Sequence, residues 1–324
     1  MCSGNTEAEQ VARGTPWQPG CNRGLHLSKG NVSQRGGLII EIIVAKEYGF
    51  CDGVKKAIEI GKTARRDNSG DVNVLKQIVH NRHVVDCLGR QGIGSVDSLG
   101  EAESGTIVFG AHGVGPGVVE EAKRKGLNTV DSTCSFVTRV HRLVKRLAEN
   151  GYAIILIGDK KHDEIIGVVA EAPESIRVIS NKREEAKGLC IDSDKISVVT
   201  QTTLSVDDTK ETVDLLRARF PSIKVYNSIC LATQRRQEAV KELAKGVDLI
   251  IVVGETGGPN SRESANSRRL VEAANACGKV SYLVNDEREV NKQWFIGVNR
   301  MGVTAGASTP NTIMERVIGA IRLL

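Results

Sequence analysis

The chain has 324 residues, of which 40% are hydrophobic, 3% aromatic and 26% charged, and its formal net charge is +5. This apolar content supports a sizeable core and excludes disordered and fibrous classes, and the length suggests two or three structural units. No apolar run approaches the ~20 residues that span a bilayer, and dispersed basic residues with few aromatics disfavour nucleic acid as a partner.

The first 39 residues are rich in Gly, Ser, Asn, Gln and Pro and show no periodicity, which is typical of a disordered N-terminal extension. The eight cysteines of the chain are too sparse for a disulfide scaffold, and no secretory signal is recognisable. We therefore expect a reducing, cytoplasmic setting, in which cysteines are core residues, nucleophiles or metal ligands. The mild positive charge fits an anionic small substrate.

From Leu38 onward, short β-branched runs alternate with helical segments. The first run, Leu38–Ala45, is followed by helical spacing over Val54–Thr63, and the later expected strands are Val72–Leu75, Thr106–Phe109, Ala153–Ile157, Ile196–Val199, Leu249–Val253, Val280–Val284 and Arg300–Thr304. Strands nearly continuous in Val and Ile that alternate with helices indicate parallel sheets covered on both faces. The sequence thus predicts an α/β fold.

Several expected strands run directly into a polar turn that contains glycine, as in Gly110-Ala111-His112-Gly113 and Thr304-Ala305-Gly306-Ala307-Ser308. Ligands of parallel α/β sheets bind beyond the carboxyl ends of the strands. These turns are therefore expected to form one site drawn from the whole chain.

Three cysteines, Cys51, Cys134 and Cys230, stand in such turns, each before an amphipathic helix and 83 and 96 residues apart. A helix N-terminus lowers the pKa of a thiol and favours a bound anion or metal. The similar spacing suggests three related units that each give one ligand to a shared centre. Three thiolates suit a [4Fe–4S] cluster with one open iron or a zinc site with a water; the competing interpretation is three buried hydrophobic side chains. The remaining five, Cys2, Cys21, Cys87, Cys190 and Cys277, receive no role.

Three histidines share the same turn context: His80, His112 and His162. A histidine at a strand end can donate to a diphosphate, although capping and solvated roles are equally common. Glu164, two residues after His162, can relay protons at the mouth of a sheet, or it is simply solvated. Hydroxyl and amide side chains in the turns bind phosphate or cap helices; they belong to Thr202, Thr203, Ser264, Asn266 and Ser308.

Taken together, these segments resemble the 4-hydroxy-3-methylbut-2-enyl diphosphate reductase (IspH/LytB) family over nearly all of residues 40–324. The resemblance rests on eight ordered motifs: Gly49-Phe50-Cys51-x-Gly53-Val54, Val79-His80-Asn81, Ala111-His112-Gly113-Val114, Asp131-x-Thr133-Cys134, His162-x-Glu164, Thr200-Gln201-Thr202-Thr203-Leu204-Ser205, Ile229-Cys230-x-Ala232-Thr233 and Thr304-Ala305-Gly306-Ala307-Ser308. Any one of them is weak, but eight in order are specific.

The resemblance implies three similar α/β lobes with mostly parallel sheets, in a pseudo-threefold arrangement around a central [4Fe–4S] cluster. We expect lobes at 40–134, 135–228 and 229–324, with the strand in 40–51 assigned either to the first lobe or to the third. Cys51, Cys134 and Cys230 would be the three ligands of the cluster, which leaves one iron open. A ferredoxin or flavodoxin is the implied electron donor, and the implied oligomeric state is a monomer or weak dimer.

The implied reaction is the reductive dehydroxylation of (E)-4-hydroxy-3-methylbut-2-enyl diphosphate to isopentenyl and dimethylallyl diphosphate, the last step of the non-mevalonate isoprenoid pathway. By the same resemblance, Glu164 delivers protons and Thr202 lies near the substrate hydroxyl. The remaining site residues would hold the substrate, mainly through its diphosphate: His80, His112, His162, Thr203, Ser264, Ala265, Asn266 and Ser308.

Some positions depart from the family pattern. Asp52 replaces a small residue beside a cluster ligand, and it should lower the cluster potential if it points inward. Asp163 replaces a proline between His162 and Glu164, Ala265 replaces a serine, and the loop 255–263 is longer than usual. These changes bear on rate and substrate, so a paralogue with an altered substrate remains open.

Three other functions compete with this interpretation. The first is another three-cysteine [4Fe–4S] enzyme, such as a quinolinate-synthase-like dehydratase, and the second is a non-catalytic module with a structural zinc site. A dinucleotide enzyme is disfavoured because the glycines near Gly254 do not make a G-x-G-x-x-G motif.

Overall fold

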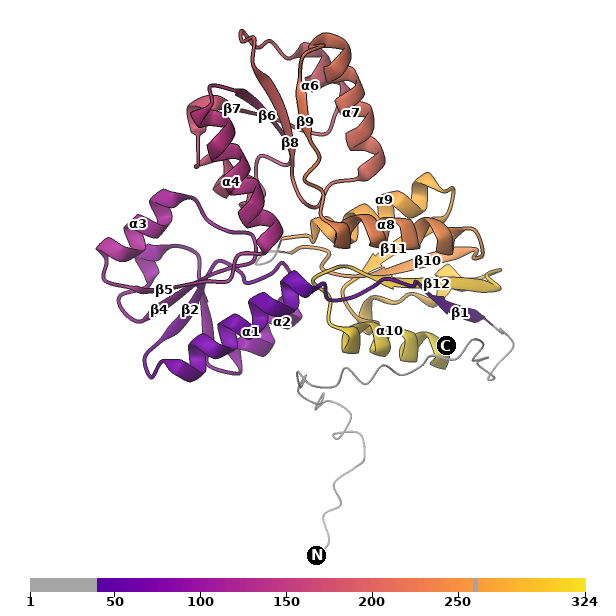
Figure 1. The fold of residues 1–324 in the computed structure, drawn as a ribbon. Coiled ribbons are helices and arrows are strands. Elements are labelled where there is room, and N and C mark those ends of the chain that lie inside the picture. Colours follow the sequence, from indigo (N-terminus) through magenta and orange to yellow (C-terminus); the bar gives the residue numbers. More distant parts are fainter. Residues whose placement is uncertain (1–39, 259–261) are drawn as a thin grey trace, which may run out of the picture.

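The computed structural model describes residues 40–258 and 262–324. The expected disordered extension at 1–39 lies outside the described residues. Three four-stranded sheets, each covered by helices, form three lobes that surround a common centre (Figure 1). Every strand pairing within these sheets is parallel, so the expected α/β fold with three parallel-sheet lobes is confirmed.

The first lobe is built on the sheet β3-β2-β4-β5. Its strands are β2 (Val72–Leu75), β3 (Ile93–Val96), β4 (Thr106–Phe109) and β5 (Asn128–Asp131), and its helices are α1 (Asp52–Asp67), α2 (Arg82–Gly89) and α3 (Pro116–Arg124), with a 3-10 turn η2 (Leu99–Glu101).

The second lobe is built on the sheet β7-β6-β8-β9. Its strands are β6 (Ala153–Ile157), β7 (Ile176–Ile179), β8 (Ile196–Thr200) and β9 (Lys224–Tyr226), and its helices are α4 (Ser135–Glu149), α5 (Asp163–Val169), α6 (Arg183–Gly188) and α7 (Val206–Arg219), with a 3-10 turn η3 (Pro173–Ser175).

The third lobe is built on the sheet β1-β12-β10-β11, which joins the start of the described chain to its end. Its strands are β1 (Glu41–Val44), β10 (Leu249–Val253), β11 (Val280–Val284) and β12 (Arg300–Ala305), and its helices are α8 (Leu231–Ala244), α9 (Ala265–Ala276) and α10 (Asn311–Leu323), with 3-10 turns η4 (Glu287–Glu289) and η5 (Lys292–Phe295). Strand β1 pairs with β12 in register from Glu41 opposite Arg300 onward.

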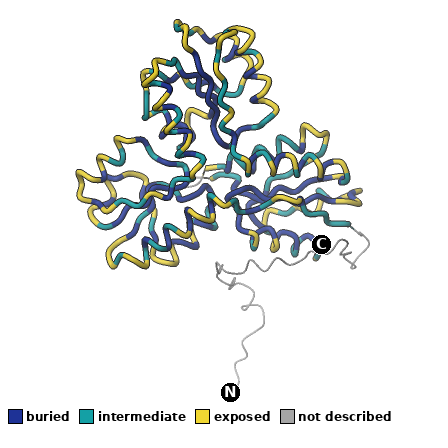
Figure 2. The backbone as a smooth tube through the Cα atoms, viewed as in Figure 1, coloured by how far each residue is buried: buried dark blue, intermediate teal, exposed yellow. Residues whose placement is uncertain are grey.

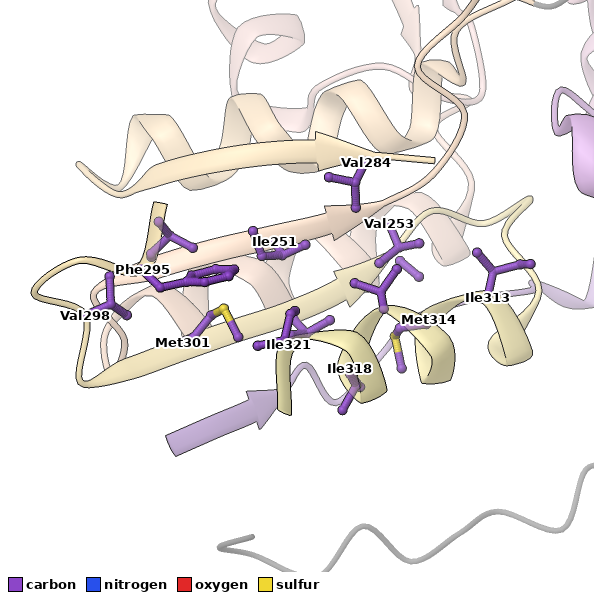
Figure 3. Packing of buried hydrophobic residues seen from close by; sticks show 14 residues of the cluster. Ile251, Val253, Val284, Phe295, Val298, Met301, Ile313, Met314, Ile318 and Ile321 are labelled. Carbon is purple, nitrogen blue, oxygen red and sulfur yellow. The ribbon is translucent and has the colours of Figure 1, made fainter. Parts of the chain in front are cut away.

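Burial on both faces explains why the central strands are continuously apolar. In β10, Ile251 and Val253 pack into the cluster under α10, whereas Ile250 and Val252 pack into the cluster on the other face with α8 and α9. Successive side chains of a strand point to opposite faces, so a sheet covered twice needs an apolar residue at every position. Figure 3 shows the α10 side of this sheet, and Figure 2 shows the buried backbone gathered in the sheets.

The strands that the sequence did not predict all lie at sheet edges. Four edge strands, β3, β5, β7 and β9, were missed, and each carries exposed or half-buried residues. An edge strand has one neighbour and a partly solvated face, so its sequence need not be apolar throughout. The inner strands β2, β4, β6, β8, β10 and β12 had all been predicted from their Val and Ile runs.

The order of strands around the centre decides which residues can meet. Each lobe's sheet ends in an edge strand, β1, β5 or β9, whose chain then continues into the first helix of the next lobe, α1, α4 or α8. These three crossings converge where the lobes meet (Figure 1). Within the described part of the chain, no helix combines the length and apolarity needed to cross a membrane.

Candidate active site

A cavity of about 660 Å³ lies where the three lobes meet. It is lined by all of the site residues predicted from the sequence: Cys51, Cys134, Cys230, Glu164, Thr202, Thr203, His80, His112, His162, Ser264, Ala265, Asn266 and Ser308. Most of the polar ones follow the inner strands of the three sheets, as expected for ligand sites at the carboxyl ends of parallel strands.

The three cysteines occupy equivalent positions at the crossings between lobes. Cys51, Cys134 and Cys230 are the N-cap residues of α1, α4 and α8. In each case the backbone N–H of the cysteine donates to a carbonyl in the turn after the neighbouring inner strand. The three acceptors are Ala307, Ala111 and Thr202, at 3.2, 3.0 and 3.0 Å. The thiols are thereby fixed to the same loops that carry Ser308, His112 and Thr202.

The expectation that the helix N-termini lower the thiol pKa values is wrong for two of the cysteines. Burial raises the pKa of Cys134, against the lowering effect of the Phe136 and Val137 N–H groups, and burial likewise raises the pKa of Cys230. Loss of hydration disfavours a thiolate more than one helix end stabilises it. Both thiols therefore need a further positive charge, such as a bound metal, to become thiolates at neutral pH.

The spacing of the thiols bears on what they can hold. Among the described residues, the one group of three or more candidate ligands with donor atoms within 4.8 Å of one another is a histidine group, so the three sulfurs do not form such a set. In the described part of the chain, the histidines and not the cysteines have the arrangement of a site for a single ion.

Gly53 leaves space between two of these sulfurs. A Cβ at this position would stand 2.7 Å from Cys134 Sγ and 3.8 Å from Cys51 Sγ. The missing side chain thus keeps open a space that two thiols border. Soft sulfur donors that surround a space larger than a single ion are the donor set of an iron–sulfur cluster, so the residues present fit that group.

Glu164 is a buried acid with one polar partner residue. Its side chain is 2% exposed, and its two carboxylate oxygens accept the N–H and the hydroxyl of Thr202, each at 2.7 Å. Burial raises its pKa to about 7, although the two hydrogen bonds from Thr202 work in the opposite direction. Near neutral pH this carboxyl can therefore both hold and release a proton.

The three histidines form a compact cluster of rings, and burial shifts their pKa values downward. The ring centroids of His80 and His112 are 4.0 Å apart, and each lies 5.3 Å from that of His162. Burial lowers the pKa of His80 to about 3 and that of His162 to about 4, and it also lowers the pKa of His112. The rings are consequently neutral at physiological pH. Nε2 of His80 is buried and has no hydrogen-bond partner within the described part of the chain, which points to a missing ligand.

The small polar residues of the third lobe complete the cavity wall. The hydroxyls of Ser264 and Ser308 are 3.3 Å apart, and Ser308 donates to the His80 carbonyl at 3.0 Å. Ser264 also caps α9 by accepting from the Ser267 N–H, so its capping and lining roles hold together. Across the cavity, Thr203 accepts from the Gln201 amide at 3.0 Å.

Thr233 belongs to the motif around Cys230, and its side chain lies between Cys230 and Asn266. Its Oγ1 lies 3.2 Å from Cys230 Sγ and donates to Asn266 Oδ1 at 3.0 Å, while its N–H donates to Cys230 Sγ at 3.4 Å. Its position three residues after an N-cap cysteine was the available signal, because the N–H of that residue faces the cap side chain.

The positions that depart from the family pattern differ in where they lie. The side chain of Asp52 is fully exposed and pairs with Lys55 at 3.5 Å, so the condition for an effect on a cluster, an inward orientation, is not met. Ala265 is the first residue of α9 and lines the cavity. Part of the loop 255–263 lies outside the described residues. Asp163, the first residue of α5, contacts charged groups of the two other lobes.

Comparison with known proteins agrees with this geometry. The family described as LytB protein matches residues 42–322. The 4-hydroxy-3-methylbut-2-enyl diphosphate reductase of Nocardia farcinica (strain IFM 10152) is 42% identical over 301 residues, which are 92% of this chain and 88% of that protein. The enzyme of the same name from Wolbachia pipientis wMel is 40% identical over 290 residues, 88% of this chain and 92% of that one.

Solved structures give the same result. The E-1-hydroxy-2-methyl-but-2-enyl-4-diphosphate reductase of Plasmodium falciparum superposes with a TM-score of 0.80 at 33% identity, and the match covers 86% of each chain. A structure of (E)-4-hydroxy-3-methyl-but-2-enyl diphosphate reductase, described as the terminal enzyme of the non-mevalonate pathway, gives a TM-score of 0.63 at 33% identity over 87% of this chain and 99% of the other.

Proposed function

The chain belongs to the LytB family, and we propose that its interlobe cavity reduces (E)-4-hydroxy-3-methylbut-2-enyl diphosphate to isopentenyl and dimethylallyl diphosphate. The protein is an oxidoreductase of the non-mevalonate isoprenoid pathway and, like its family, uses an iron–sulfur cluster. The observation that carries the assignment to this cavity is the convergence of three N-cap cysteines, a buried acid and a neutral histidine cluster on one space.

We assign Cys51, Cys134 and Cys230 as the three ligands of a [4Fe–4S] cluster with one open iron. The shared cavity that the three thiols line and the space that Gly53 leaves beside two of them support this assignment over a structural zinc site. When bound, the cluster would pass on the two electrons of the reaction, one at a time from an external donor, and would offer a Lewis-acidic iron for the hydroxyl oxygen.

Glu164 is the proton source in this proposal. The reaction takes up two electrons and two protons, breaks the allylic C–O bond and releases water. A carboxyl with a pKa of about 7 carries a proton in a large fraction of molecules at neutral pH and can pass it to the departing hydroxyl oxygen. Thr202 fixes both carboxylate oxygens and places its own hydroxyl beside them.

The diphosphate is assigned to the histidine and serine side of the cavity. His80, His112 and His162 contribute uncharged N–H donors, and Ser264, Asn266 and Ser308 contribute hydroxyl and amide donors from the third lobe; Thr203 and Ala265 line the remaining wall. Burial of a triply charged group requires many such donors. A ferredoxin or flavodoxin donor, a monomeric or weakly dimeric state and a cytoplasmic location stay predictions.

The proposal is tested by anaerobic purification, iron and sulfide analysis, and an assay with (E)-4-hydroxy-3-methylbut-2-enyl diphosphate and a chemical reductant. We expect about four irons per chain and both isopentenyl and dimethylallyl diphosphate as products. Cluster-loaded protein that leaves this substrate unchanged would reject the reductase function, and zinc as the sole bound metal would reject the cluster. A dehydratase of the quinolinate-synthase kind would show cluster iron but no reduction of the allylic alcohol.

A further inference from the structure

Asp163 holds one cationic side chain from each of the two other lobes at the edge of the cavity. Its Oδ1 contacts Lys76 Nζ at 2.5 Å, and the same oxygen lies 3.5 Å from Arg262 Nη1. Lys76 follows β2 in the first lobe, Asp163 opens α5 in the second, and Arg262 precedes α9 in the third. Arg262 also donates to the carbonyl of Lys161, two residues before Asp163.

This charged group borders the histidine cluster directly. Asp163 Oδ2 is 3.6 Å from His80 Nε2, a contact between a carboxylate and a neutral ring because burial holds the pKa of His80 at about 3. Arg262 lowers the pKa of all three histidines, and Lys76 lowers that of His80. Lys76 and Asp163 also line a neighbouring cavity of about 850 Å³ that shares His112 with the site cavity.

The site cavity itself lacks compensating positive charge. Among the described residues that line it there is no lysine and no arginine, and its histidines are neutral. A triply charged diphosphate placed there would be held by neutral donors alone, next to the negative charge of Asp163. Buried anions are stabilised when a cation pairs with them. Two candidates at this edge are the cations that pair with Asp163.

The exposure of the three side chains is compatible with the exchange of one anionic partner for another. Asp163 is 11% exposed, whereas Lys76 is 42% and Arg262 is 50% exposed, so the cations can change partner without leaving a buried position. Lys76 is moreover the one non-glycine among the described residues with a positive φ, 60°. A left-handed lysine is strained, and strain of this kind persists where the surroundings fix it, often at functional sites.

We propose that Lys76 and Arg262 are the cationic partners of the substrate diphosphate, and that Asp163 occupies them as a resident anion which the diphosphate displaces. This inference rests on the proposed function of the cavity as a diphosphate site. Asp163 is then a positioning residue that weakens diphosphate binding. Its carboxylate keeps the two cations at the mouth of the cavity, but it competes with the ligand for them.

The experiment measures the Kd of inorganic diphosphate by calorimetry on anaerobically prepared, cluster-loaded protein. Lys76→Ala and Arg262→Ala should each raise this Kd by roughly 5- to 20-fold, because each removes a charge-assisted contact to phosphate. Asp163→Asn should lower it by roughly 3- to 10-fold, because it frees both cations and removes a neighbouring negative charge. Lys210→Ala and Asp207→Asn are matched controls for net charge, since each removes one partner of a remote, exposed ion pair.

The double variant Lys76→Ala/Asp163→Asn separates competition from simple bracing of the lobes. If Asp163 competes for Lys76, the gain from Asp163→Asn should shrink when Lys76 is absent. Weaker binding in Asp163→Asn, or unchanged binding in both cation variants, would overturn the inference. The turnover of the allylic diphosphate by wild-type protein is measured separately. If the Kd values for inorganic diphosphate change as expected but the allylic diphosphate is not turned over, the proposed function is rejected and the roles of Lys76, Arg262 and Asp163 in binding the anion stand.

Discussion

Thr202 satisfies both oxygens of Glu164: its N–H donates to one and its hydroxyl to the other, each at 2.7 Å. The carbonyl of the same residue accepts the N–H of Cys230 at 3.0 Å. One short turn after β8 therefore connects the proposed proton donor to a proposed cluster ligand. Glu164 cannot leave this turn without breaking both of its hydrogen bonds to Thr202, and a fixed position of this kind is what the proposed proton transfer requires.

Glu164→Gln tests the role of this acid. Glutamine keeps the shape and can still bond to Thr202, but it holds no transferable proton, so kcat should fall by roughly 10²–10⁴-fold. Iron content and the Kd of inorganic diphosphate should stay at their wild-type values. Glu171→Gln, which alters a carboxyl paired with His141 outside the site cavity, is the control. Full turnover in Glu164→Gln would remove this residue from the mechanism.

The raised pKa of Glu164 predicts a pH dependence with a definite sign. Its ordinary value is 4.5 and burial raises it to about 7. If Glu164 delivers the proton as proposed, its protonated form is the active one, so kcat should be highest below pH 7 and should decline as the pH rises through about 7. The Glu164→Gln variant should lack this decline in its residual rate. A wild-type kcat that increases across the same interval would contradict the assignment.

The Glu164 carboxyl also makes the free energy of unfolding decrease as the pH rises. In the unfolded chain it ionises near 4.5, but in the folded protein ionisation leaves a charge in a buried site. Its contribution is therefore fully present below pH 4.5 and is lost as the pH rises toward 7. Urea unfolding of the cluster-loaded protein between these pH values should show less loss of stability for Glu164→Gln than for wild type.

Replacement of single cysteines separates the ligand set from the others. Cys51→Ser, Cys134→Ser and Cys230→Ser should each lose most of the iron, because a serine oxygen is a poor ligand for iron–sulfur clusters. Cys190→Ser and Cys277→Ser alter exposed thiols and should retain wild-type iron and sulfide. Equal iron loss in both groups would show a general effect on folding instead.

Gly53 offers a test of the space between the thiols. Gly53→Ala would place a Cβ 2.7 Å from Cys134 Sγ, so iron content should fall strongly even though all three cysteines remain. Gly319→Ala, within α10, meets nothing within 4 Å and should keep its iron. Because alanine is the better helix former by about 1 kcal/mol, this control should also be slightly more stable. Normal iron in Gly53→Ala would refute the proposed location.

Thr233 is predicted to position Asn266 for the substrate. Thr233→Val removes the hydroxyl that donates to Asn266 but keeps the side-chain shape and the N–H that reaches Cys230. Loss of one hydrogen bond of ordinary strength should raise KM by roughly 2- to 10-fold with unchanged iron. Thr233→Ser restores the hydroxyl and should restore KM. If serine failed to rescue, the methyl group rather than the hydroxyl would be the important contact.

The histidine cluster shows how far sequence patterns reach. His80 and His112 were grouped with His162 because each follows a strand end, and parallel sheets bring such ends together. The pattern could not show that their rings lie within 5.3 Å of one another. It also could not show that burial holds them neutral, since desolvation depends on what the three lobes cover jointly.

The edge strands and the pKa values of the thiols are features that the sequence did not predict correctly. Strand β9 was missed because a half-exposed edge needs no apolar run, and the chain direction from β9 into α8 was therefore invisible. The expectation of lowered thiol pKa values considered the helix N-terminus but not the burial that outweighs it. Both errors have one cause: local sequence does not report the surroundings that other lobes provide.

By itself, the sequence determined the α/β class, the inner strands and the side chains that line the central cavity, because these follow from local periodicity and from residue types in strand-end turns. Only the tertiary structure decided that Cys51, Cys134 and Cys230 stand at the three crossings between lobes, and that β1 completes the sheet of the last lobe. It also decided that Asp163 reaches Lys76 and Arg262. These relationships join residues far apart in the chain, so they depend on how the lobes close around one centre, which no local pattern encodes.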